Sequence, residues 1–130
     1  MSNNDTIGNM ITSIKNANLA KLTKINIKST KLVYRILNIL SKEGFIEIEK
    51  SLYPGIISVR IKYEDLGQKP YITNIVRISK PGLRVFVNKN QIPRIWGGVG
   101  ICLLSTSKGI LTGQEAKKYK VGGEMILQIW

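Results

Sequence analysis

The sequence lacks histidine and contains a single cysteine, Cys102. Histidine is the commonest general base and zinc ligand in proteins, and one cysteine can form neither an internal disulfide nor a multi-cysteine metal site. Cys102 lies within the apolar run Val99–Leu104, which is typical of a buried structural thiol. We therefore expect no catalytic residue, no metal site and no cofactor.

Acidic side chains are also scarce. Eight Asp and Glu face twenty Lys and Arg, which gives a net charge of +12. Uncompensated positive charge destabilises a compact chain and usually serves a polyanionic partner such as nucleic acid. Residues 66–130 carry ten basic and two acidic side chains, against ten and six in residues 1–65, so the second half is the better candidate for an RNA surface. Charge alone leaves open a basic protein whose charge serves only its solubility.

Long hydrophobic runs are missing as well. No apolar run approaches the roughly 20 residues that a bilayer-spanning helix needs, so we expect no membrane partner. Hydrophobic residues nevertheless make up 43% of the 130 residues, which is enough for a packed core in one domain or two small ones.

The first half has the pattern of a mixed α/β domain. Apolar residues recur at helical spacing from Ile7 to Ile14 and from Leu32 to Leu40, which predicts two amphipathic helices. The first should end near residues 16–18, and Ser29 or Thr30 should cap the second. Strands are predicted over residues 25–27, 45–49 and 57–63, with a turn at 52–55.

From residue 71 the pattern changes to short strands. Thr112 to Glu115 match a capping box and predict a short helix through Lys120. Strands are predicted over residues 72–79, 83–87, 101–105 and 124–130, with a helical turn at 91–96 and a tighter turn at Gly122-Gly123.

The fold class that follows is α+β. Residues 1–64 predict an N-terminal α-β-α-β-β domain, and the polar stretch 65–70 predicts a linker. Residues 71–130 predict a mostly β C-terminal domain with one short helix, and we expect this domain to bind RNA.

Catalytic motifs are incomplete in this chain. Ser105 and Lys108 have the spacing of a serine acyl-enzyme motif, but its companion motifs S-D-N and K-T-G are absent. Gly98 and Gly100 begin like a dinucleotide-binding loop, but position 103 is Leu instead of Gly. We therefore expect neither an enzyme nor a small-molecule substrate.

The segment Ser105-Thr106-Ser107-Lys108-Gly109 fits contact with RNA. Its three hydroxyls can bind phosphates, 2′-OH groups or bases, its lysine attracts phosphates, and its glycine permits close approach of the backbone. The same composition is also typical of an ordinary polar turn, and the residues alone leave both interpretations open.

A second basic segment contains Lys80, Arg84 and Phe86. The two cations can bind phosphates, and an exposed Phe86 can stack on an unpaired base. The alternative, which the residues also leave open, is that Phe86 is a core aromatic on a strand.

These motifs, in their order along the chain, resemble the bacterial-type small-subunit ribosomal protein S8 family. The resemblance covers nearly the whole chain. It is carried by Asp5–Ile7, Thr12–Ala17, Glu43–Ile46, Arg77–Val85, Ser105–Gly109, Glu115–Ala116 and Gly122–Glu124. Ile92–Ile95 and the terminal Ile129-Trp130 look most like the plastid-encoded members.

The resemblance implies a structural role in the small ribosomal subunit. It implies binding to the central domain of the small-subunit (16S-type) rRNA early in assembly, next to neighbouring ribosomal proteins. It also implies a place in the chloroplast stroma rather than a bacterial cytoplasm. The alternative function is a free-standing RNA-binding translational regulator that uses the same surface, whereas a basic protein–protein adaptor fits the hydroxyl-rich segment poorly.

The resemblance also assigns RNA-contacting positions. They are Ser105, Thr106, Ser107, Lys108, Gly122, Gly123 and Glu124 in the second half, with Thr6, Ser29, Thr30 and Lys31 in the first. Four further RNA contacts are predicted from the chemistry of the residues themselves: Gly109, Lys80, Arg84 and Phe86. Phe86 stands where the family usually has Tyr, which keeps a stacking ring and removes a hydroxyl. Gly113 replaces a commonly acidic residue, which lowers helix propensity.

Overall fold

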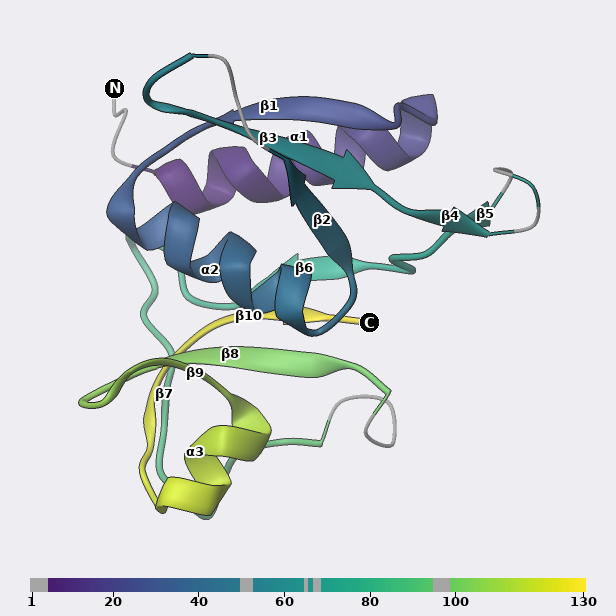
Figure 1. Ribbon diagram of the computed structural model, residues 1–130. Coiled ribbons are helices and arrows are strands. Elements are labelled where there is room, and N and C mark those ends of the chain that lie inside the picture. The colour runs from purple at the N-terminus through teal and green to yellow at the C-terminus, as the bar shows by residue number, and fades with distance from the viewer. Residues whose placement is uncertain (1–4, 50–52, 65, 67–68, 95–98) are drawn as a thin grey trace. The chain divides into compact units, whose positions relative to one another are not determined.

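The computed structural model describes residues 5–49, 53–64, 66, 69–94 and 99–130 (Figure 1). It consists of two compact units, residues 1–73 and 74–130, called unit 1 and unit 2 below. Helices and antiparallel strands occur in both, and unit 2 is mostly β with one short helix. The predicted α+β class is confirmed.

Unit 1 is a three-stranded antiparallel sheet with two helices and a small hairpin. The sheet order is β1-β3-β2, and β4 pairs with β5. Helix α1 packs against β1 and β3, and α2 packs against β2. The elements are α1 (Thr6–Ala20), β1 (Lys24–Lys28), α2 (Lys31–Lys42), β2 (Ile46–Glu49), β3 (Ile56–Ile61), β4 (Tyr63–Glu64) and β5 (Lys69–Pro70).

The helices of unit 1 follow the apolar spacing of the sequence. Asp5 caps α1 by accepting a hydrogen bond from the Gly8 amide, and Thr30 caps α2 by accepting one from the Val33 amide. The inward faces are buried and comprise Met10, Ile11, Ile14 and Ala17 of α1 with Val33, Ile36, Leu37 and Leu40 of α2. Helix α1 runs to Ala20, beyond the predicted end, because the buried face that the sequence signals ends at Ala17, whereas Leu19 and Ala20 are exposed.

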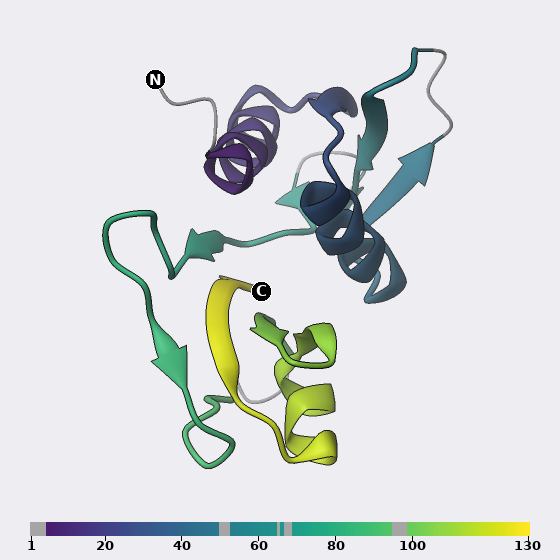
Figure 2. The same cartoon turned by 90° about the vertical axis from the view of Figure 1, so that its left-hand side faces the viewer.

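Unit 2 is built around its last strand. Strand β10 pairs with β8 on one side, and on the other with β7 at its beginning and β6 at its end. Figure 2 shows β7 on one side of β10 (yellow) and α3 on the other. The elements are β6 (Ile75–Arg77), β7 (Phe86–Val87), β8 (Ile101–Thr106), β9 (Gly109–Thr112), α3 (Gly113–Tyr119) and β10 (Gly123–Ile129).

Helix α3 covers one face of this sheet. Its Ala116 packs into a buried cluster with Ile92, Cys102 and Leu104. The predicted capping box is present, since the Thr112 hydroxyl accepts from the Glu115 amide and the Glu115 carboxylate accepts from the Thr112 amide.

Several local predictions in unit 2 were wrong. Residues 91–94 are not helical, because Pro93 has no amide proton and disfavours the helical conformation at Ile92; residues 95 and 96 lie outside the described residues. Gly122-Gly123 is not a turn, because Gly123 already begins β10. Strand β9 was not predicted, and the strand predicted over 72–79 is limited to β6.

The proposed linker contains part of the β4–β5 hairpin, in which Lys69 pairs with Glu64 and Pro70 with Tyr63. Residues 65, 67 and 68 lie outside the described residues, as does part of the turn predicted at 52–55. That residues 65–70 separate two independent domains stays a prediction.

Candidate nucleic-acid interface

One row of side chains, exposed at Phe86 and Ser105 and half-buried at Glu124, crosses three strands of unit 2. Glu124 of β10 is paired with Phe86 of β7 on one side and with Ser105 of β8 on the other. Residues directly opposite one another in antiparallel strands project from the same face of the sheet. Phe86 is 69% exposed, so it is not the core aromatic that the sequence left possible. We call Phe86, Glu124 and Ser105 the strand row.

An ion pair flanks the strand row. The Arg84 guanidinium Nη1 donates a hydrogen bond to the Glu124 carboxylate Oε2 over 3.2 Å. The pair places a positive charge directly beside the carboxylate. Its contribution to stability is small, because the Arg84 side chain is more than half exposed.

The turn between β8 and β9 is held by the hydroxyl of Thr106, a residue predicted to contact RNA. The Thr106 hydroxyl donates to the Gly109 carbonyl oxygen over 2.8 Å and accepts from the Lys108 amide over 3.1 Å. Gly109 has φ +104°, a backbone conformation that side chains disfavour. Thr106 and Gly109 therefore shape the turn.

The remaining members of this turn face solvent. Ser105, Ser107 and Lys108 are exposed, and neither serine hydroxyl has a hydrogen-bond partner among the residues that the structure describes. Their donors and acceptors are available to a ligand. The ordinary-turn interpretation thus holds for Thr106 and Gly109, whereas Ser105, Ser107 and Lys108 remain available.

Tyr119 of α3 was missed by sequence reasoning. The Lys108 ammonium lies 5.7 Å from the centroid of its ring, and the Lys118 ammonium lies 5.9 Å from it. Such distances allow cation–π attraction, which draws Lys108 toward α3. The signal in the sequence was the run Lys117-Lys118-Tyr119-Lys120, in which an aromatic is interleaved with cations.

Gly122 and Gly123 allow the three strands to approach closely. A Cβ at Gly122 would lie 2.4 Å from the Val87 carbonyl oxygen, and a Cβ at Gly123 would lie 2.2 Å from that of Ser105. No side chain fits at these distances without a shift of backbone. Both glycines therefore place the strand row, whether or not RNA also touches them.

The loop that carries Lys80 and Arg84 is fixed by a buried serine. The Ser79 hydroxyl accepts from the Val85 amide over 2.8 Å, and the backbones of Lys80 and Leu83 bond to each other. Lys80 and Arg84 are exposed, so the loop presents both cations from a defined backbone.

The predicted positions Thr6, Ser29, Thr30 and Lys31 belong to unit 1. Thr6 begins α1, and Lys31 begins α2 with its side chain exposed. The Thr30 hydroxyl is engaged as the cap of α2, and the Ser29 amide donates to the Gly55 carbonyl oxygen. Lys31 is the one cation among these four residues, and its exposed side chain is available to a ligand.

The other chemical groups of the chain have structural surroundings. Burial raises the pKa of the Cys102 thiol, so at neutral pH the thiol stays protonated and is a poor nucleophile. Within the described ranges, no cluster of three His, Cys, Asp or Glu side chains is placed to hold a metal ion. The helices described are each too short or too polar to cross a membrane.

Comparisons with known proteins agree along nearly the full chain. The family model described as ribosomal protein S8 matches residues 5–130. Small ribosomal subunit protein uS8c of Marchantia polymorpha is 46% identical over 130 residues, with 98% of each chain covered. The uS8c protein of Physcomitrium patens is 48% identical over 131 residues with the same coverage. The uS8 protein of Thermosynechococcus vestitus is 43% identical over 133 residues, with 100% of each chain covered.

Proposed function

The chain belongs to the ribosomal protein S8 family, and on this premise we propose that it is a structural constituent of the small ribosomal subunit that binds the central domain of the small-subunit rRNA. Plastid-type uS8c proteins are among its relatives, which supports a place in the chloroplast ribosome. Its role is to hold folded RNA next to neighbouring small-subunit proteins, without a catalytic step.

The observation that carries this proposal is the strand row beside the exposed β8–β9 turn. On one face of its sheet and in the adjoining β8–β9 turn, unit 2 presents a stacking ring at Phe86, an acceptor at Glu124 and hydroxyls at Ser105 and Ser107. Irregular RNA offers unpaired bases and 2′-OH groups that match these functions. Lys108 adds a cation for phosphate.

The predicted site residues then divide into two roles. Phe86 stacks, Ser105 and Ser107 bind hydroxyl or base groups, Glu124 accepts from base N–H groups, and Lys80 and Lys108 bind phosphates. Thr106, Gly109, Gly122 and Gly123 shape the surface, and Arg84 holds the Glu124 carboxylate. In unit 1, Lys31 contributes a phosphate contact, while Thr6, Ser29 and Thr30 form the segments at the starts of α1 and α2.

Two substitutions in the β8–β9 turn test the proposal. Ser107→Ala removes a hydroxyl, so it should weaken binding to a central-domain rRNA fragment by about 1–3 kcal/mol without changing the salt dependence. Lys108→Ala removes a cation, so it should weaken binding to the fragment and to a random duplex alike. The slope of log K against log salt should become shallower by about 0.7–0.9.

Filter binding of each folded variant to both RNAs gives the result. If both variants bind the fragment like the parent protein, the turn is not the RNA site. Sedimentation of an extract tests the ribosomal role: the chain should travel with small subunits. A chain that remained free of them would instead fit the translational regulator.

A further inference from the structure

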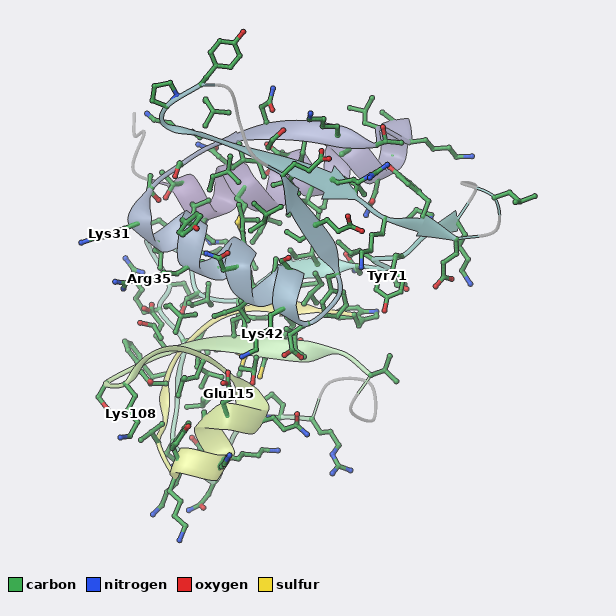
Figure 3. All side chains as sticks on the ribbon, in the orientation of Figure 1. Lys31, Arg35, Lys42, Tyr71, Lys108 and Glu115 are labelled. Atoms are coloured by element: carbon green, nitrogen blue, oxygen red, sulfur yellow. The ribbon has the colours of Figure 1, made fainter. Side chains whose placement is uncertain are left out.

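Helix α2 has two faces of opposite character. Its inward face is fully buried through Val33, Ile36, Leu37 and Leu40. Lys31, Arg35, Asn38 and Lys42 are all exposed, and their spacing of i, i+4, i+7 and i+11 aligns them along one side of the helix. Figure 3 shows the three cations along the α2 ribbon. We call these four residues the α2 stripe.

The α2 stripe carries no acidic residue. In the described part of the chain, Lys24 pairs with Glu49 and Arg84 pairs with Glu124, and neither ion pair involves a cation of the stripe. Glu43, at the C-cap of α2, is the nearest acidic residue in sequence, and no described ion pair joins it to Lys42. The positive charge of the stripe is uncompensated within the described part of unit 1.

Two of these cations are unfavourable for the helix itself. Lys31 lies in the first turn, at the positive end of the helix dipole, and that turn holds no acidic residue. Lys31 and Arg35 form a like-charge pair at i, i+4, which destabilises a helix. The helix dipole and the like-charge pair therefore do not favour these two cations, and their exposed charge is available to a partner outside the fold.

We propose that the α2 stripe is a second RNA-contacting surface, which tracks phosphates of the same rRNA; the inference rests on the proposed function. At a rise of about 1.5 Å per residue, Lys31 to Lys42 extend over about 16 Å, enough to meet several phosphates of one strand. Arg35 and Lys42 bind phosphate, and Asn38 offers a neutral donor between them. Lysine is depleted in protein–protein interfaces, so the stripe fits RNA better than a protein partner.

The test measures binding of the full chain to full-length small-subunit rRNA over a series of salt concentrations. Arg35→Gln should lower the association constant about threefold and make the log–log salt slope shallower by about 0.7–0.9. Arg35→Gln with Lys42→Gln should lower the association constant about tenfold and double the change in slope. Lys15→Gln is the matched control, because it also removes one exposed cation from a helix of unit 1. It should change binding less than twofold.

A charge reversal separates binding from folding. Arg35→Glu turns the like-charge pair with Lys31 into an opposite-charge pair, so the melting temperature should stay the same or rise. RNA binding should fall further than in Arg35→Gln. Weaker binding together with a lower melting temperature would point to damage of the helix and would overturn the proposal.

The other outcomes also decide the question. If Ser107→Ala and Lys108→Ala weaken binding but the α2 variants bind like the parent protein, the inference fails and the proposed function stands. If Lys15→Gln lowers the association constant as much as Arg35→Gln does, the loss reflects net charge alone, and the stripe is not an RNA-binding site. If the α2 variants bind rRNA normally but no longer sediment with small subunits, the stripe binds a protein. A parent protein without preference for small-subunit rRNA would contradict the proposed function itself.

Discussion

Unit 1 and unit 2 present their polar side chains in different ways. In unit 1, the α2 stripe comes from a single helix, and its alignment depends only on the helical repeat. In unit 2, the strand row takes Phe86, Glu124 and Ser105 from three strands far apart in sequence. On a single helix, one residue can be substituted while the others keep their positions. In a row across a sheet, a shift in the backbone contacts that set the strand register displaces every member of the row.

Among the substitutions considered, a change at Gly123 should have the largest effect. In Gly123→Ala, the added Cβ would lie 2.2 Å from the Ser105 carbonyl oxygen, so β10 and β8 must move apart. We expect a loss of about 1–3 kcal/mol in the free energy of unfolding, and weaker RNA binding by the protein that remains folded. Urea denaturation followed by circular dichroism measures the first quantity.

Gly82→Ala is the matched control for this substitution. A Cβ at Gly82 would have no atom within 4 Å, and Gly82 does not have a positive φ. The free energy of unfolding of Gly82→Ala should lie within about 0.5 kcal/mol of that of the parent protein. An unchanged urea midpoint in Gly123→Ala would mean that the close approach of the strands does not place the row.

Substitution of Phe86 should have the next largest effect. It should change RNA binding and leave stability nearly unchanged. Phe86→Leu should weaken binding to the central-domain fragment by about 1–3 kcal/mol, because a stacking ring is lost. The melting temperature should hardly change, since the ring is exposed. Phe86→Tyr keeps the ring and adds a hydroxyl, so it should bind as well as the parent protein or better. A lower melting temperature with unchanged affinity in Phe86→Leu would remove Phe86 from the site.

The smallest effect should come from Arg84. Its charge is paired with Glu124, so Arg84→Gln should change the salt slope of RNA binding by less than half the change seen in Arg35→Gln. Glu124→Gln should raise affinity for a random duplex slightly, because an unneutralised Arg84 is left behind. A double-mutant cycle in urea should give a coupling of about 0.2–1 kcal/mol that declines with salt. Equal salt slopes for Arg84→Gln and Arg35→Gln would show that Arg84 itself contacts phosphate.

Much of the fold could be predicted because its signals are local. The apolar repeat of α2, its cap at Thr30 and the capping box at Thr112–Glu115 each involve residues within one or two helical turns. Strand β9 was missed because Gly109–Thr112 is too short for an alternating pattern and exists only through pairing with β8. From the sequence, Gly113 was expected only to lower helix propensity. In the structure, a Cβ at this position would lie 2.6 Å from the Cys102 sulfur, so Gly113 also makes room for the packing of α3 against β8.

The sequence by itself determined the excess of positive charge, the helices and their caps, and the residue types that suit RNA. The alignment of Lys31, Arg35 and Lys42 was also present in it, because a helix brings neighbours in sequence onto one face. Only the tertiary structure decided that Phe86 faces solvent beside Glu124 and Ser105, and that the Thr106 hydroxyl turns back onto its own backbone. The reason is that strand register depends on contacts between distant segments, and the residues of one segment do not encode which partner will lie opposite.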